Sequence, residues 1–372
     1  MDTDQAVKLT QDKLAQEGGT MGDLLARFRS MISPVLIGDH QWERILQTAG
    51  DFPIIVGALP FGFELPLHES QPIADLGVSL SAESAIQQSF AERARVDGTD
   101  ETAKAVLRLF DLINAERSQL REIVGQKMML EYDIGSAQVD ECPRPGMFMR
   151  PGERPIVGAC DQTNDVIAVA DALVSSVGWE LQDGQRKTLR DVYLAQPEDT
   201  RLDAFGIFPS RSRSIRLAIM GFKSRPDIHR YLETTNWPGE LSDVDRILSR
   251  FMERVKVVRT GVYLDVQENG LSPDLGLTLI VRQRYTKESR YWLDGMTDWD
   301  PFLQALGLED LVSREKLAEL GNWVSKPVTL FSKSGQFVLL RGIHHIKLVI
   351  SENQLKGVKA YVFFVLSGTV QY

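Results

Sequence analysis

The last strand pair of the chain, residues 344–366, has the sequence HHIKLVISENQLKGVKAYVFFVL and decides the predicted fold. Apolar residues occupy alternate positions on both sides of residues 352–354, and polar residues stand between them. Alternation with a period of two predicts strands with one apolar and one polar face, and the short connection predicts an antiparallel hairpin. The polar faces carry His345, Lys347, Lys359 and Tyr361.

Similar strand pairs recur upstream, separated by stretches whose pattern predicts helices. The pairs are expected at residues 61–68 with 75–80, 204–208 with 214–221, and 261–267 with 276–284. A further strand at 128–134 has its candidate partner at 146–150. No GxGxxG or GxxxxGK[ST] motif occurs, so a dinucleotide site and a P-loop are not supported.

The order helix, strand, strand, helix predicts an α+β fold of repeated αββα units. An antiparallel sheet of about ten strands would expose its edges unless it closed, so we expect a β-barrel ringed by helices. The same alternation also fits an open sheet with one solvated face. The expected organisation is an N-terminal helical segment at 1–50 and a single barrel domain at 51–372.

Composition limits the classes of partner. The net charge of −9 argues against general binding to nucleic acid or anionic membranes. Cys142 and Cys160 form no CxxC motif, which favours reduced thiols in a cytoplasmic protein. The chain shows no secretory signal and no apolar stretch long enough for a membrane span. We therefore predict a cytoplasmic protein without a membrane span.

Closure of the barrel would bring the polar strand faces together in one chamber. Charges enclosed in this way become partly desolvated and paired, which is typical of a functional site. The expected lumen residues are Glu64, Glu131, Asp133, Arg216, Asp265, Arg282, Lys347, Lys359 and Tyr361.

Residues 50–370 resemble, in motif order, the aromatic prenyltransferase barrel family of bacterial and fungal indole and phenol prenyltransferases. That family has a short Pro–apolar–Glu–apolar element on its first strand, and LPFGFELPL places Glu64 at the similar position. FGIFPSRSRSIRLAIM keeps Arg216, and the last strand pair contains the family's Lys-x-Tyr as Lys359 and Tyr361, opposite Lys347. The C-terminal portion also resembles uncharacterised bacterial proteins found near peptide natural-product enzymes.

The resemblance implies transfer of an allylic prenyl group from a diphosphate to an aromatic or peptide acceptor in natural product biosynthesis. It implies prenyl diphosphate as co-substrate and leaves a requirement for Mg²⁺ open. Glu64 would orient the acceptor and remove its proton. The predicted diphosphate ligands are Arg216, Arg282, Lys347 and Lys359, and the tyrosines predicted to shield the allylic cation are Tyr263 and Tyr361.

The chain also departs from the family pattern, which keeps two alternatives open. Gly276 and Thr278 stand where a cation and a phenol would fall, and Ala218 and Met220 replace another Lys and Tyr. These losses favour a catalytically divergent barrel that binds a partner or an intermediate in peptide maturation.

A hydrolase or metal enzyme is the second alternative, using residues such as Glu131, Asp265, His344 and His345. Adjacent residues of a regular strand point to opposite faces, so His344 and His345 are not expected to share a metal ion.

Overall fold

The computed structural model describes residues 3–135, 144–158, 161–257, 259–281, 299–324 and 327–368. Its strands are β1 (Phe61–Pro66), β2 (Asp75–Ser81), β3 (Lys127–Tyr132), β4 (Gly146–Met149), β5 (Ile156–Val157), β6 (Arg201–Phe208), β7 (Ser212–Phe222), β8 (Arg259–Gln267), β9 (Gly270–Ile280), β10 (Val328–Ser332), β11 (Gly335–Ser351) and β12 (Gln354–Ser367).

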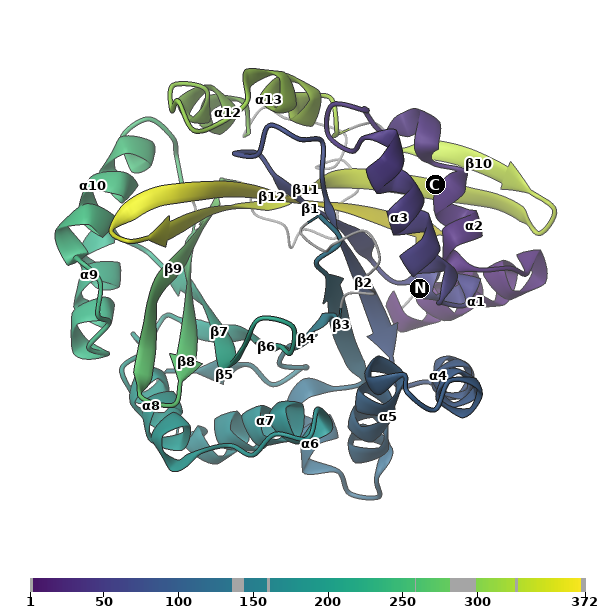
Figure 1. The fold of residues 1–372 in the computed structure, drawn as a ribbon, viewed down its shortest axis with the longest axis horizontal. Helices are drawn as coiled ribbons and strands as arrows, with labels where there is room; N and C mark the ends of the chain where they lie inside the picture. Colours follow the sequence, from purple (N-terminus) through teal and green to yellow (C-terminus); the bar gives the residue numbers. More distant parts are fainter. Residues whose placement is uncertain are drawn as a thin grey trace.

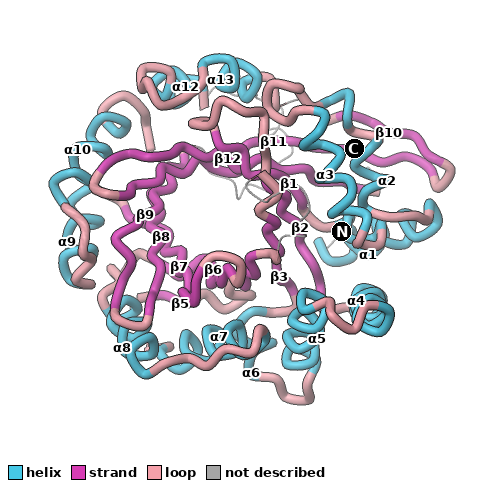
Figure 2. The backbone as a smooth tube through the Cα atoms, in the orientation of Figure 1, coloured by secondary structure: helices cyan, strands magenta, loops and turns pink. Residues whose placement is uncertain are grey.

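Ten of these strands close into an antiparallel barrel. Their order is β11, β12, β1, β2, β3, β4, β6, β7, β8 and β9, and β9 pairs again with β11. Figure 2 shows this ring of strands on the inside and the helices around it. Closure satisfies the backbone groups that an open sheet would leave at its two edges. The predicted α+β barrel is confirmed, and the open sheet is excluded.

The helices form an outer layer around the barrel (Figure 1). They are α1 (Thr3–Glu17), α2 (Met21–Ala26), α3 (Asp39–Gly50), α4 (Ser84–Val96), α5 (Glu101–Asn114), α6 (Gln119–Val124), α7 (Thr163–Ser176), α8 (Asp183–Leu194), α9 (Arg225–Thr234), α10 (Leu241–Met252), α12 (Asp300–Leu306) and α13 (Arg314–Gly321). None of the helices in the described part of the chain is both long enough and apolar enough to cross a membrane.

The hydrophobic core lies between the outer face of the barrel and the helices. On β7 the alternate residues Ile215, Leu217 and Ile219 have no exposed surface, whereas Arg216 between them faces the lumen. The helices present matching apolar stripes: on α10, the buried residues recur at a spacing of three and four. The two apolar layers cover each other, which leaves the polar registers of the strands inside the barrel.

The N-terminal helices are attached to the end of the barrel where β10 and the first half of β11 extend beyond the ring. Lys13 of α1 donates hydrogen bonds to the carbonyl oxygens of Gln336 and Gly368, at 3.2 and 2.6 Å. The backbone N–H of Ser334 donates to Glu17 of α1 at 2.7 Å. A domain boundary near residue 50, where α3 ends, stays a prediction.

The sequence pattern located most elements but missed others. The predicted pairing of the strand at 128–134 with residues 146–150 is confirmed as β3 and β4. The helix α8 and the strand β10 were not predicted. In β10 every residue is exposed or half-buried, and the exposed Phe331 interrupts the alternation of apolar and polar residues in the sequence.

Candidate functional site

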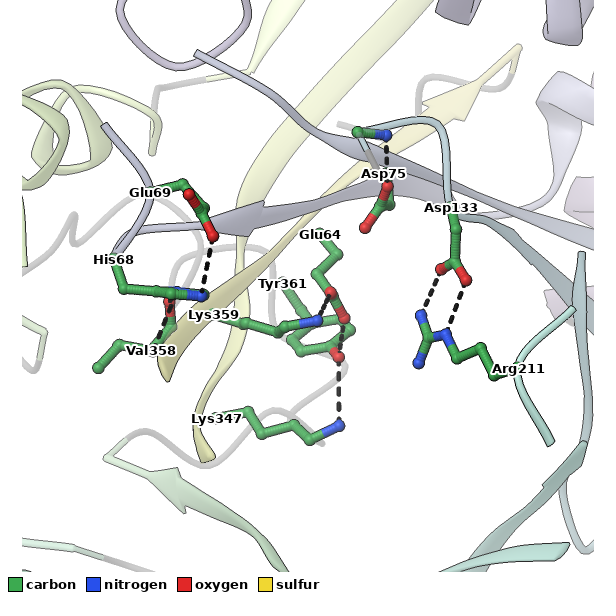
Figure 3. Close-up of polar contacts among 11 residues, drawn as sticks. Glu64, His68, Glu69, Asp75, Asp133, Arg211, Lys347, Val358, Lys359 and Tyr361 are labelled. Carbon is green, nitrogen blue, oxygen red and sulfur yellow. Dashed lines mark hydrogen bonds and ion pairs between the residues drawn. The ribbon is translucent and has the colours of Figure 1, made fainter. Parts of the chain in front are cut away.

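A chain of polar contacts crosses the lumen wall formed by β1, β12 and β11. Glu64 accepts hydrogen bonds from the Lys359 ammonium and the Tyr361 hydroxyl. Lys347 in turn donates to the Tyr361 hydroxyl at 3.5 Å (Figure 3). The strand register explains the arrangement, because Glu64 pairs with Tyr361 across β1 and β12, and Lys347 pairs with Lys359 across β11 and β12. Four of the predicted site residues therefore lie together.

Glu64 is ionised in this setting. Burial alone would raise its pKa, but the charges of Lys359 and Lys347 and the two hydrogen bonds lower the pKa to about 2. Both carboxylate oxygens already accept a hydrogen bond. Such a carboxylate is a weak base, and it holds Lys359 and Tyr361 in position.

Lys347 is a buried cation without a carboxylate partner in the described residues. Its residue surface is 7% exposed, and its Nζ lies 4.6 Å from the ring centroid of Tyr263 and 5.8 Å from that of Tyr361. Burial, together with the nearby charge of Arg216, lowers the pKa of Lys347 to about 7. A Cβ built on Gly276 would lie 2.7 Å from Cε of Lys347, so the glycine makes room for this side chain. An anion entering the chamber would find Lys347 available.

Arg216 is already paired. Its Nε and Nη2 donate to the two carboxylate oxygens of Asp265 at 2.8 and 2.7 Å, directly across β7 and β8. Its guanidinium also lies 4.7 Å from the ring centroid of Phe208. Burial would lower the pKa of Arg216, but the hydrogen bonds and charge of Asp265 raise it overall. As a diphosphate ligand, Arg216 would act with its carboxylate attached. Arg282, the remaining predicted ligand, lies outside the described residues.

A second arginine–carboxylate pair, which the sequence did not predict, joins the β6–β7 turn to the residue that follows β3. Arg211 donates from Nε to Asp133 at 2.7 Å, and its Nη2 contacts the other carboxylate oxygen. The Arg211 guanidinium lies 4.0 Å from the ring centroid of Phe208. Figure 3 shows this pair apart from the Glu64 contacts. No sequence pattern indicates this contact, because Asp133 and Arg211 are 78 residues apart.

Two further carboxyl groups on the adjacent wall titrate at unusually high pH. Burial, reinforced by the charge of Glu64, raises the pKa of Asp75 to about 8 and that of Glu131 to about 7. Asp75 accepts a hydrogen bond from the backbone N–H of Gly135 at 2.8 Å. Asp75 was missed as a lumen residue, although the small and polar Gly77 and Ser79 of its register indicated that face.

The two adjacent histidines lie differently from the prediction. A β-bulge in β11 places both His344 and His345 opposite the step from Val362 to Tyr361. Their rings are 4.8 Å apart and joined by a hydrogen bond between the two Nδ1 atoms, so they do not point to opposite faces. His345 stacks on Tyr361 with ring centroids 4.2 Å apart. In the part of the chain that the structure describes, no group of three or more His, Cys, Asp or Glu is placed to hold a metal ion.

The site thus gathers aromatic rings and charged groups on the lumen-facing sides of the strands, and most of these charges neutralise one another. Among the described residues of this site, Arg211, Arg216 and Lys359 each have a carboxylate partner, and Lys347 is available to a ligand. A buried ammonium beside tyrosine rings can bind an anionic group and stabilise a carbocation next to it. A carboxyl group that titrates near neutral pH can accept or donate a proton.

Comparison with known proteins supports the fold. No protein-family model matches the sequence, and no curated protein matches it. The solved structure of AnaPT from Neosartorya fischeri is 11% identical with a TM-score of 0.51, and the match covers 94% of this chain and 93% of that chain. The prenyltransferase PriB, in a binary complex with product diphosphate, is 13% identical with a TM-score of 0.50, and the match covers 93% of this chain and 95% of that chain.

At these identities the likeness shows the fold alone. It extends over nearly the whole of both chains, including the closed ring of strands. The predicted αββα prenyltransferase barrel is therefore confirmed as the fold of this chain.

Proposed function

Because the chain has the barrel fold of solved prenyltransferases, we propose that it transfers an allylic prenyl group from a diphosphate to an aromatic acceptor. The diphosphate would bind at Lys347 and Lys359, with Arg216 beside them. Tyr263 and Tyr361 would shield the allylic cation. A peptide that presents an aromatic side chain belongs to the same acceptor class.

The observation that carries this proposal is the opposition of Lys347 and Lys359 inside the barrel. Like charges that face each other directly across two strands repel, and burial increases the repulsion. Glu64 neutralises only Lys359 by direct contact. A di- or trianion between the two ammonium groups would remove the repulsion and satisfy both donors.

The aromatic rings next to this lysine pair support the proposed stabilisation of the allylic cation. The Lys347 ammonium lies over the Tyr263 ring, and Tyr361 reaches both Lys347 and Glu64. A prenyl chain whose diphosphate lies at Lys347 would place its reacting carbon among these rings. Departure of diphosphate creates positive charge on that carbon, which the electron-rich ring faces stabilise.

The predicted role of Glu64 as the base remains untested. Its two occupied oxygens and low pKa favour a positioning role, in which it fixes the Lys359 ammonium and the Tyr361 hydroxyl. Loss of Glu64 would therefore disturb diphosphate binding as well as any contact with the acceptor.

Isothermal titration with dimethylallyl and geranyl thiolodiphosphate, with and without Mg²⁺, tests the proposal. We expect micromolar binding that is lost in the Lys347→Ala variant and in the Lys347→Ala/Lys359→Ala double variant. Lys356→Ala is the matched control, because Lys356 is an exposed residue of the same hairpin and pairs with Glu352. Absence of binding to the wild-type protein at millimolar analogue would remove the transferase proposal.

A second candidate function follows from the charge pairing. Arg211, Arg216 and Lys359 each contact a carboxylate, so little free positive charge remains for a diphosphate. This observation favours a divergent barrel that binds an uncharged or mixed-charge partner, such as a peptide intermediate. Failure of the titration would favour this function, and co-purification with peptide substrates would then identify the partner.

A further inference from the structure

We propose that Glu131, rather than Glu64, accepts the proton of the acceptor, and that a planar aromatic acceptor lies beside it over Gly77. The inference rests on the proposed prenyl transfer for its chemistry. It goes beyond that proposal by naming the proton acceptor, the place of the aromatic ring, and the requirement for a ring N–H or O–H.

The Glu131 side chain is enclosed but has no contact that uses its carboxylate. It stands on β3 between Leu130 and Tyr132, which face the outer core, so it points into the lumen. Its residue surface is 6% exposed. No residue in the described ranges gives Glu131 a hydrogen bond or an ion pair. A buried carboxylate without donors is unfavourable, and the N–H or O–H of a ligand would satisfy it.

The strand register leaves space next to Glu131. Its direct neighbours across the sheet are Gly77 on β2 and Gly146 on β4. The Phe208 ring covers Gly146, because a Cβ built there would lie 2.6 Å from Cε1 of that ring. Over Gly77, by contrast, a Cβ would meet only the Gly62 carbonyl oxygen, at 3.8 Å, among the described atoms. The carboxylate thus has an aromatic ring on one side and an open stretch of backbone on the other.

A flat stretch of this kind suits a flat molecule. A planar ring can lie against the peptide group of Gly77, where any side chain would hold it away. The neighbouring Gly62 is covered by β12, because a Cβ built there would overlap the Val362 carbonyl oxygen. The N–H or O–H edge of the planar ring would then point across the sheet from Gly77 to its paired residue Glu131, whose carboxylate would accept the hydrogen bond. An aliphatic or bulky acceptor would not use this surface.

The charges around Glu131 bring the pKa of its carboxyl group into the range suited to proton transfer. Burial and the charge of Glu64 raise its pKa to about 7, while Lys347, Lys359 and Arg211 act in the opposite direction. A base is most effective when its pKa lies near the working pH. The titratable and charged groups that face it are Glu64, Asp75, Asp133, Arg211, Arg216, Lys347, Lys359 and Tyr361.

The neighbouring carboxyl groups are less suited to the same role. Glu64 has both oxygens occupied, and its pKa is lowered to about 2. The pKa of Asp75 is raised to about 8, so Asp75 holds its proton at neutral pH and accepts from the Gly135 N–H. Glu131 is therefore the carboxylate that is both ionisable near pH 7 and available.

The proposed step balances with the two substrates. The N–H or O–H bond of the acceptor breaks, the proton passes to Glu131, and the electron pair moves into the ring. A ring carbon bonds to the allylic carbon, whose C–O bond breaks, and diphosphate leaves with that electron pair. The ring regains aromaticity when its C–H proton returns to nitrogen or oxygen, and Glu131 releases its proton to solvent.

Binding of indole and of 1-methylindole, without any prenyl analogue, tests the inference. At pH 8 we expect the wild-type protein to bind indole at least about tenfold more tightly than 1-methylindole, as expected for a hydrogen bond to a charged acceptor. Glu131→Met should lower indole affinity to that of 1-methylindole, and Asp75→Asn should keep the preference. The wild-type preference should weaken as the pH falls through about 7, because a protonated Glu131 accepts the indole N–H only through a neutral oxygen.

Glu131→Gln separates binding from proton transfer and also covers the case in which Glu131→Met does not fold. Its neutral amide oxygen still accepts the indole N–H, so a weaker preference that does not change with pH should persist while prenyl transfer to indole is lost. Equal binding of the two probes by wild-type protein, or an unchanged preference in Glu131→Met, would overturn the inference. These results are independent of thiolodiphosphate binding, so failure of the acceptor site and failure of the transferase proposal are distinguishable.

Discussion

Two adjacent walls of the barrel carry buried glutamates in opposite electrostatic states. On the wall of β1, β11 and β12, Glu64 accepts from Lys359 and Tyr361, and its pKa is lowered. On the wall of β2 and β3, Glu131 lacks such donors among the described residues, and its pKa is raised. The two side chains are similarly buried, at 3% and 6% exposure. Partners rather than burial therefore decide whether a carboxylate in this lumen is a structural anion or a candidate base.

Removal of each glutamate should have opposite effects on stability, and this is the largest effect we expect. Glu64→Ala leaves Lys359 without its carboxylate, and breaking a buried ion pair in this way typically costs about 3–5 kcal/mol. Glu131→Gln removes an unpaired buried charge and should not destabilise the protein at pH 8. Denaturant unfolding of the two variants checks the difference, and equal losses of unfolding free energy would contradict it.

The pH dependence of stability should separate the same two residues. The folded-state pKa of Glu131 is raised from 4.5 to about 7, so its stabilising contribution is fully present below pH 4.5. That contribution is lost as the pH rises through about 7. Relative to Glu131→Gln, the wild-type protein should lose roughly 1–3 kcal/mol of unfolding free energy between pH 4.5 and 8. A flat difference across this range would show that Glu131 titrates normally.

Diphosphate binding at the wall of β1, β11 and β12 should depend on pH through Lys347. Only its protonated form attracts a diphosphate, and its pKa is lowered to about 7. Thiolodiphosphate affinity should therefore fall about fivefold between pH 7 and pH 8, as the protonated fraction of Lys347 falls. Lys347→Met should bind weakly with little change over this range, whereas Lys356→Met should behave as wild type. Constant affinity in the wild-type protein would mean that Lys347 stays charged.

The fold could be predicted from the sequence because its signals are local. The lumen-facing and core-facing residues of each strand alternate in the sequence. The exposed edges of an open ten-strand sheet favoured closure into a barrel, and the resemblance of motif order agreed with it. The pair Lys347 and Lys359 was placed correctly on facing strands, because the short hairpin turn fixes their register. Glu64 and Tyr361, which are 297 residues apart, were expected in the same lumen, but their direct contact was not predicted.

The pairing of charges was not predictable from the sequence. Arg211 could have been a solvated turn residue, and only the closed barrel brings it to Asp133. The β-bulge at His344 adds one residue to β11, and the one nearby signal, Gly342, lies upstream of the segment predicted as a strand. The opposite states of Glu64 and Glu131 depend on which donors lie within hydrogen-bond distance, and strand alternation carries no such information.

Two glycine substitutions give the smallest expected effects and compare the two walls directly. Gly276→Ala places a Cβ against Cε of Lys347, which must move, so thiolodiphosphate affinity should fall by about threefold. Gly77→Ala places its Cβ beside Glu131 at an ordinary contact distance from the Gly62 carbonyl oxygen, so folding should be unaffected while indole binds more weakly.

Titration of Gly276→Ala and Gly77→Ala, each with thiolodiphosphate and with indole, tests whether the two walls bind their ligands independently. Independent subsites predict that each alanine weakens one ligand and leaves the other unchanged. Loss of both ligands in either variant would instead mean that the walls act as one site. In that case the charge of a bound diphosphate would set the protonation of Glu131, because an anion at Lys347 would raise the pKa of every nearby carboxyl group.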